Sequence, residues 1–277
     1  MRSKRQRQYE RLFLKFRDMQ IKQGITIANK QVKVEIRTIN SIFNNNSSVE
    51  KVQSAIKKYY NTKAKQQWQQ TYANIWDITG KATIGFITDY YSAGKTFSIV
   101  TYSADSKADP IQSKVDAYTS DYLKNKGRER VVSLNDTTSK RVLTYIDGLI
   151  QQDEEQNKSV TKFSLGEIGN NVKGFLTDVW TKRIEPVIAT EIVPITGAVV
   201  MLALSILKKD MLKVWKTMGD DNVRPAHQDA ELDYADGIPL DEPYIVDGEE
   251  LWWPGDPSGS DGNVINCRCW EEHIRGD

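Results

Sequence analysis

The chain is predicted to be mainly α-helical, with an elongated helical body followed by a small C-terminal α+β module of short strands and turns. Before Met218, apolar residues recur at helical spacing over long stretches with few helix breakers. After Met218, Gly, Pro and Asp recur every few residues and the apolar stretches shorten, which is typical of strands and turns. Hydrophobic residues make up 39% of the 277 and charged residues 27%, a composition that fits long, solvent-exposed helices better than a dense enzyme core.

We expect three parts: a basic helical region over residues 1–130, a second helical region over 131–212 and an acidic module over 213–277. The net charge of +1 conceals this segregation. Met1–Lys65 contains sixteen Lys or Arg against four Asp or Glu, whereas Met218–Asp277 contains three against sixteen. The basic block is either a solvated surface or a contact surface for phosphate or an acidic partner, and both interpretations stay open. The residues singled out as DNA or partner contacts are Arg5, Arg7, Arg11, Lys15, Arg17, Lys57 and Lys58.

The first region is predicted to be a series of helices. Residues 9–22 form an amphipathic basic helix, residues 25–43 a second helix, and residues 49–76 a long third helix whose first turn Ser48 caps. Residues 111–126 form another helix after a polar linker over 103–110. Residues 80–100 contain three glycines among apolar residues, and their periodicity leaves the assignment open.

The second region is predicted to contain three helices. Side-chain oxygens over residues 135–138 are suited to cap the first, and Ser164 with Glu167 forms a capping box for the second. Residues 192–207 are almost wholly apolar, but the stretch is shorter than the roughly 20 residues that span a bilayer and contains Pro194. We therefore predict a buried helix, with a membrane-inserted helix as the alternative. The first seven residues are rich in charged side chains, but no apolar stretch follows them, so they are not expected to form a signal peptide.

The C-terminal module concentrates the residues that can carry chemistry. Residues 213–270 contain both cysteines of the chain, one of its two histidines and four of its seven tryptophans. Short strands are expected at 238–240, 244–246 and 251–253. The ordered motifs are Lys213-x-Trp215, Val223-Arg224-x-x-His227, Asp236-Gly237, Pro254-Gly255-Asp256-Pro257 and Asn266-Cys267-Arg268-Cys269.

This ordered set resembles the C-terminal module of the Mu F-like head morphogenesis family of tailed phages. The resemblance covers about Val131–Trp270 and also favours a helix with a break over residues 80–100. It implies a minor head protein at or near the portal vertex, taking part in capsid assembly and in DNA packaging or ejection. The implied partners are the portal protein, the major capsid or scaffolding protein and double-stranded DNA. The implied locations are the virion head and, during assembly, the host cytoplasm.

Two cysteines and a histidine in this module suggest a metal site. Side chains alternate in an extended segment, so Cys267 and Cys269 can present both sulfurs to one ion, and a disulfide between residues i and i+2 would be badly strained. Thiolate and imidazole ligands suit Zn, which wants a fourth ligand at a structural site. The candidates for that fourth ligand are His273, Asp256, Asp229 and Asp236. The alternative is two buried thiols and a hydrogen-bonded histidine in a tryptophan-lined core.

Other residues of the module have simpler explanations beside functional ones. Arg224 and Arg268 are expected to pair with local carboxylates rather than to form an anion site. Trp252 and Trp253 are expected to close a small core rather than to bind a partner.

No catalytic residues are assigned, because the chain lacks the nucleotide-binding loop, the nucleophile elbow and the zinc-protease motif. We expect a structural protein with no small-molecule substrate. A metal-dependent enzyme acting on nucleic acid through His227 and a membrane-active ejection protein are the alternatives.

Overall fold

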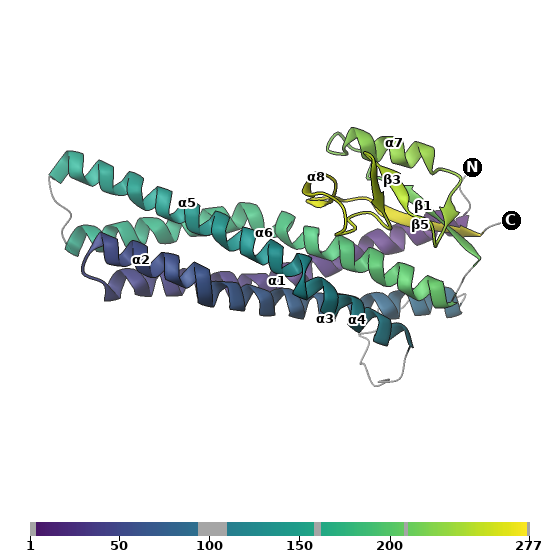
Figure 1. Cartoon of the computed structure of the whole chain (residues 1–277), viewed down its shortest axis with the longest axis horizontal. Helices are drawn as coiled ribbons and strands as arrows, with labels where there is room; N and C mark the ends of the chain where they lie inside the picture. The colour runs from purple at the N-terminus through teal and green to yellow at the C-terminus, as the bar shows by residue number, and fades with distance from the viewer. Residues whose placement is uncertain (1–3, 94–109, 158–161, 208–209, 276–277) are drawn as a thin grey trace. The chain divides into compact units, whose positions relative to one another are not determined.

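The computed structural model describes residues 4–93, 110–157, 162–207 and 210–275, and it confirms a mainly α chain that ends in a small α+β module (Figure 1). The side chains of Arg5 and of residues 92–93, 153–157 and 162–164 are not described. The helices are α1 (Lys4–Asn45), α2 (Val49–Tyr59), η1 (Tyr60–Ala64), α3 (Lys65–Ala93), α4 (Pro110–Lys124), α5 (Lys126–Asn157), α6 (Lys162–Leu207), α7 (Pro225–Asp233) and α8 (Asp261–Val264). The strands are β1 (Met211–Lys216), β2 (Ile238–Pro239), β3 (Tyr244–Val246), β4 (Glu249–Leu251) and β5 (Trp270–Arg275).

The chain divides into two compact units, and both are assembled from separate segments. Unit 1 contains Met1–Gly24, Asn74–Asp121 and Pro186–Asp277, and unit 2 contains Ile25–Ala73 and Tyr122–Glu185. These boundaries differ from the expected division at residues 130 and 212, because α1, α3 and α6 each contribute to both units. The N-terminal turns of α1 thus belong to the same unit as the C-terminal module.

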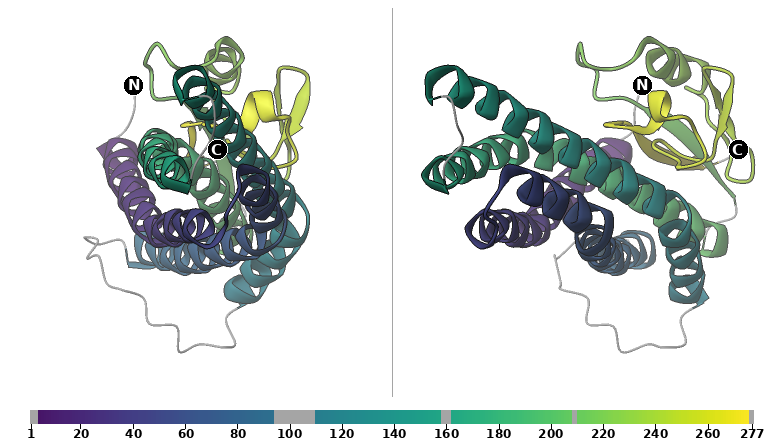
Figure 2. Two further views of the ribbon diagram at one scale, coloured as in Figure 1. Left: turned by 90° about the vertical axis from the view of Figure 1, so that its left-hand side faces the viewer. Right: turned by 60° about the vertical axis from the view of Figure 1, so that its left-hand side comes forward.

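Unit 2 is a helical bundle, and its helices can be followed in Figure 2. Its core contains a buried carboxylate. Glu35 on α1 is fully buried. It accepts hydrogen bonds from the Tyr60 hydroxyl at 2.8 Å, the Trp68 indole at 3.1 Å and the Trp180 indole at 3.0 Å. Tyr60 opens η1, a single π-helical turn between α2 and α3, a feature that in helices often marks a local constraint. Three donors satisfy a charge that would otherwise be costly to bury.

Helices in the first region are longer than predicted. The two helices expected over residues 9–22 and 25–43 are one helix, α1. The helix expected over 49–76 runs on through η1 and α3 to Ala93, and it has no break over the described part, 80–93, of the stretch where one was expected. Residues 94–100 of that stretch and 103–109 of the expected linker lie outside the described residues. The cap predicted at Ser48 is confirmed, because its hydroxyl accepts from the Lys51 amide.

The cap expected over residues 135–138 is wrong. Helix α5 is continuous through this stretch, and the side chains of Asn135 and Thr138 each donate back to a carbonyl four residues earlier at 2.7 Å. Ser, Thr and Asn can make such bonds inside a helix as readily as at its start, so their presence alone does not mark an end.

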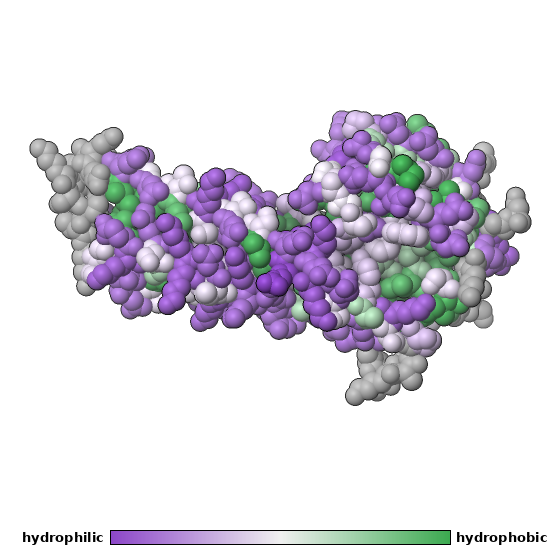
Figure 3. Space-filling model, viewed as in Figure 1, coloured by the Kyte–Doolittle hydropathy of each residue, from purple (hydrophilic) through white to green (hydrophobic). Residues whose placement is uncertain are grey.

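The helices expected after Ser164 and over 192–207 are also one helix, α6, which begins at Lys162 and holds Pro186 and Pro194 in its interior. The Ser164 side chain is outside the described set. A stretch of α6, Leu165–Leu207, is long and apolar enough to cross a membrane, with a mean hydropathy of 2.1 over its most apolar window. Within that window 83% of the residues are buried in the protein, which agrees with the prediction of a buried helix. Hydrophilic residues cover most of the face visible in Figure 3.

The C-terminal module, residues 211–275 of unit 1, contains two small antiparallel sheets. One has the strand order β2-β1-β5, and the other pairs β3 with β4. Strands β1 and β5 are paired along their whole length, with Lys213 opposite His273. Gly237 and Gly255, the glycines of the Asp-Gly and Pro-Gly-Asp-Pro motifs, have φ of 82° and 79°. Both turns use the left-handed conformation that glycine adopts at no steric cost.

Candidate metal centre

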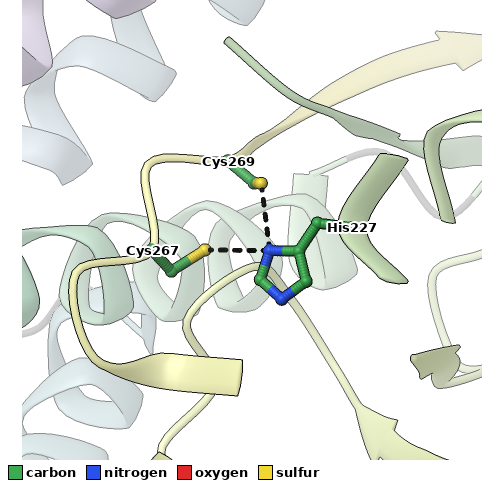
Figure 4. Close-up of side chains that lie close together, drawn as sticks. All are labelled: His227, Cys267 and Cys269. Atoms are coloured by element: carbon green, nitrogen blue, oxygen red, sulfur yellow. Dashed lines mark hydrogen bonds between the residues drawn. The ribbon is translucent and has the colours of Figure 1, made fainter. Parts of the chain in front are cut away.

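Three side chains from two parts of the module converge at one buried point (Figure 4). His227 lies in the first turn of α7, just after Pro225, and Cys267 and Cys269 lie in the extended segment that enters β5. His227 Nδ1 is 3.4 Å from Cys269 Sγ and 3.8 Å from Cys267 Sγ. All three ligand atoms lie within 4.8 Å of one another. Each of the three residues is at most 3% exposed.

These distances match one tetrahedral ion. Zn–S bonds of about 2.3 Å and a Zn–N bond of about 2.05 Å, at a tetrahedral angle, place nitrogen and sulfur about 3.6 Å apart. The two observed N···S distances, 3.4 and 3.8 Å, lie on either side of this value. A single ring nitrogen can donate only one proton, whereas one ion engages both sulfurs and the nitrogen together. The three residues could therefore hold one metal ion, an arrangement compatible with Zn.

The two thiols have different pKa values because each affects the other. Both cysteines are free. The Cys269 thiol and then His227 stabilise the Cys267 thiolate and lower the pKa of Cys267 well below its usual range, although burial opposes this. The neighbouring Cys267 sulfur and burial raise the pKa of Cys269. Cys267 is thus the more acidic of the two thiols, and metal binding would displace the protons of both.

The residue before the first cysteine sets the backbone that presents it. Asn266 has φ of 56°, a left-handed conformation that Asn tolerates better than most residues. Its amide donates to the Thr190 hydroxyl on α6 at 2.9 Å. That hydroxyl in turn donates to the Pro186 carbonyl at 2.7 Å. The cysteine segment is therefore fixed to the buried part of α6.

Two arginines hold the segment from its other sides. Arg224, the residue that precedes α7, donates to the Ile265 carbonyl at 2.6 Å. Arg17 on α1 is only 4% exposed and donates to the carbonyls of Arg268 at 2.8 Å and Cys269 at 3.4 Å. Burial lowers the pKa of Arg17, while Asp18 and the two cysteines oppose the shift. Both guanidinium groups thus bond to backbone carbonyls in or next to the cysteine motif.

The expected pairing of the module's arginines with carboxylates is half correct. Arg268 forms a two-pronged ion pair with Asp220 at 2.7 and 2.5 Å, as predicted. Arg224 instead bonds to a backbone carbonyl, as described above. Arginine has five N–H donors, and a backbone carbonyl oxygen can accept from them as well as a carboxylate can.

The remaining motif residues surround the centre. Trp215 on β1 packs edge-on against His227 with ring centres 5.3 Å apart. Lys213, two residues earlier on the same face of β1, is fully buried and donates to the Trp252 carbonyl at 2.8 Å. Its burial lowers its pKa, and Glu271 opposes that shift. The structural role of Lys213 was not predicted, although a lysine alternating with a core tryptophan on one strand was the available signal.

The two adjacent tryptophans differ in their surroundings. Trp253 packs edge-on against Tyr118 at 5.6 Å and lies so close to α6 that a Cβ at Gly197 would come within 2.5 Å of its ring. It closes the core of unit 1, as expected. Trp252 is 40% exposed, and the Lys213 ammonium lies 5.5 Å from its ring centre.

None of the four candidate fourth ligands joins the cluster. Asp256 is buried but accepts from the amides of Trp252 and Ser258, so it stabilises its own turn. His273 lies on β5 beside Glu271, with 3.7 Å between its Nε2 and the carboxylate. Asp229 and Asp236 are exposed. The structure thus brings the three predicted ligands together and leaves the four candidates for the fourth outside the cluster, two of them buried elsewhere in the module.

The space beside the centre is small. Cys269, Arg17 and Tyr9 are among the residues that line a cavity of about 10 Å³. That volume has room for about one water molecule. The described residues therefore offer three protein ligands and, next to one of them, space for a water but not for a substrate.

The basic residues singled out as contact candidates do not all reach the surface. Arg7, Arg11 and Lys15 on α1 are exposed, as are Lys57 and Lys58 on α2. The side chain of Arg5 lies outside the described set. Arg17 is the correction, because it is buried against the cysteine segment. It lies four residues after Phe13 on the apolar face of α1, and that position was the signal that it turns inward.

Comparisons with protein-family models, with curated proteins and with solved structures found no match for this chain.

Proposed function

We propose that this chain is a minor head protein of a tailed phage and that a zinc ion holds its C-terminal module together. The supporting observation is the convergence of motifs that are distant in sequence. His227, from the Val-Arg-x-x-His motif, meets both cysteines of the Asn-Cys-Arg-Cys motif. Trp215, from the Lys-x-Trp motif, packs against His227. Three of the motifs that carry the resemblance to the Mu F-like family therefore meet at one point in this chain.

The burial of the centre favours a structural role for the metal over a catalytic one. A catalytic zinc needs an open position that substrate can reach. Here the ligands are at most 3% exposed, and the cavity that Cys269 helps to line holds about 10 Å³. Both cysteines lie in the hydrophobic core of the module beside Trp215, so the free energy of metal binding there would contribute to folding. We assign no catalytic residue.

The proposed partners follow from the resemblance together with the exposed charges. The portal protein and the major capsid or scaffolding protein are the expected protein partners, in the virion head and in the host cytoplasm during assembly. Five exposed basic residues on α1 and α2 supply a surface for double-stranded DNA or for an acidic protein. The burial of most of the apolar stretch of α6 disfavours a membrane partner.

Virions from the strain that encodes the chain test this function. The chain should be present in purified particles in few copies, and gold-labelled antibody should mark one vertex. Its absence from particles of confirmed infectivity would remove the proposal. Nuclease activity that is lost in His227→Ala while the fold is intact would instead support an enzyme.

A further inference from the structure

A groove with an apolar floor and basic rims lies between α5 and α6 in unit 2. It encloses about 980 Å³. Its floor includes Tyr145 on α5 and Phe175 on α6, whose rings stack with centres 4.2 Å apart. Leu149 and Val179 extend the apolar lining. The stacked rings join α5 to α6, so both walls of the groove belong to one pair of packed helices.

The rims of the groove carry an excess of positive charge. Lys140 and Arg141 line one side, and Lys182 and Arg183 line the other. Asp178, the acidic residue in the lining, is paired with Lys182 at 2.8 Å. Repulsion from Arg141 adds to burial in lowering the pKa of Arg183. The Arg183 guanidinium already donates to the Thr138 hydroxyl at 3.1 Å and lies over the Trp180 ring, so Lys140 and Arg141 carry the positive charge that suits an acidic ligand.

The outer face of α7 has the complementary pattern. Leu232 is 74% exposed, the largest exposure among the large hydrophobic side chains of the described residues. Asp229 is exposed one turn before it on the same helical face, Asp233 is exposed as the next residue along the helix, and Asp236 follows just after the helix. No described residue forms an ion pair with these three carboxylates. A protruding leucine flanked by aspartates is an unusual surface for a helix with no partner.

We propose that α7 of one copy of this chain docks into the α5–α6 groove of a second copy. Leu232 inserts against the Tyr145–Phe175 floor, and Asp229 and Asp233 meet the basic rims. When a helix docks into a groove, apolar anchors supply affinity and flanking charges supply orientation, and Leu232 is the apolar anchor on the outer face of α7. The groove and α7 are different surfaces, so the contact is head-to-tail and can propagate into a ring or a chain of copies.

A second copy fits the groove better than nucleic acid does. Phosphates would satisfy the basic rims but would leave the apolar floor and the exposed Leu232 without a partner. The chain itself carries the matching ligand, because residues 218–277 hold sixteen acidic residues against three basic ones. This inference does not depend on the metal or on the phage assignment.

The test is sedimentation of the full chain over a range of concentrations and salt. The wild type should self-associate, and salt should weaken the association. Leu232→Ala, Lys140→Glu/Arg141→Glu and Asp229→Lys/Asp233→Lys should each weaken it by about tenfold or more. All of these positions are exposed, so circular dichroism should show unchanged folding. Asp221→Lys/Glu250→Lys is the matched control, with the same charge change at other exposed sites of the module, and should leave association unchanged.

Mixing the two charge variants gives the decisive result. Lys140→Glu/Arg141→Glu and Asp229→Lys/Asp233→Lys each place like charges against each other and should remain monomeric alone. Their mixture restores opposite charges between positions 140 and 141 of one copy and positions 229 and 233 of the other, and should associate. A monomeric wild type, or variants that lose association without recovery on mixing, would overturn the proposal. Loss of binding to a DNA duplex in the groove variant, with association unchanged, would assign the groove to nucleic acid instead.

Discussion

At the scale of single residues, the backbone of Asn266 is a point of strain next to a metal ligand. Its φ of 56° is compatible with Gly and costly for a β-branched residue. We expect Asn266→Gly to change the free energy of unfolding by less than about 1 kcal/mol and Asn266→Val to lower it by about 1–3 kcal/mol. Urea denaturation measures both. Equal effects of the two substitutions would show that the backbone conformation is not what this position requires.

Arg17 gives a second residue-scale prediction. Its guanidinium satisfies two carbonyls at the cysteine motif from a buried position. Arg17→Met keeps the aliphatic length but leaves those carbonyls without a donor, so we expect a loss of about 2–3 kcal/mol in unfolding free energy. Lys15→Met, at an exposed position on the same helix, is the control and should cost less than about 0.5 kcal/mol. Similar values for the two variants would contradict the assigned role.

The ligand types were predictable from sequence, but the residues that support them were not. Cysteine and histidine are rare in this chain and chemically distinctive, so their clustering carried information. Arg17 was assigned to a DNA surface because charge alone predicts exposure. Its spacing from Phe13 on the apolar face of α1 signals that it turns inward, but its acceptor lies about 250 residues away in sequence, and no local pattern identifies that partner.

At the scale of elements, Glu35 ties α1, η1, α3 and α6 together in unit 2. Burial raises its pKa, while the bonds from Trp180, Tyr60 and Trp68 oppose the rise. A carboxyl group with a folded pKa above its unfolded value, about 4.3, contributes stability below that value, and the contribution is lost as pH rises through the folded pKa. Because Tyr60→Phe removes one opposing bond, it should raise the folded pKa of Glu35 further.

Tyr60→Phe should therefore cost more stability at high pH than at low pH. The gap from the wild type should be small near pH 4 and should grow to about 1.5–3 kcal/mol once pH exceeds the folded pKa, as for a hydrogen bond to a charged group. Tyr59→Phe is the control, because the Tyr59 hydroxyl bonds to the neutral Gln67 amide at 3.2 Å and its cost should stay constant. Thermal or urea unfolding across pH measures both, and parallel curves for the two variants would refute this account of Glu35.

Element type was predictable, whereas element ends were not. Helical periodicity correctly marked nearly every described helix before residue 208. The ends failed where local signals had two meanings, as at Asn135 and Thr138, which bond back into α5. Pro194 did not end α6, because the helix is packed in the core of unit 1 and tertiary packing outweighs local propensity. Strands β1 and β5 were not assigned, since their pairing links distant segments.

At the scale of the whole molecule, the two ends of the chain fold together. Residues 1–24 belong to unit 1 with the C-terminal module, and Tyr9 and Phe13 lie with ring centres 6.3 and 6.0 Å from that of Trp270 on β5. Deleting residues 1–24 should therefore expose a core surface of the module and not merely remove a basic arm. The deletion should speed hydrogen exchange of the amides in residues 211–275, which measures how often the module opens.

A charge-only variant separates folding from binding in that experiment. Arg11→Gln/Lys15→Gln removes exposed charge from α1 and should leave exchange in the module unchanged. If the protein binds DNA or an acidic partner through α1, this variant should weaken that binding and reduce its salt dependence. Unchanged exchange after the deletion would show that the module folds without the N-terminal turns.

The central claim is that His227, Cys267 and Cys269 hold one metal ion, and elemental analysis by mass spectrometry tests it most directly. The full chain, purified without chelator, should contain about one zinc per chain, and so should His273→Gln, since His273 lies outside the cluster. Cys269→Ser and His227→Ala should contain far less. A wild-type chain that binds no zinc, even after incubation with excess Zn²⁺ under reducing conditions, would contradict the account.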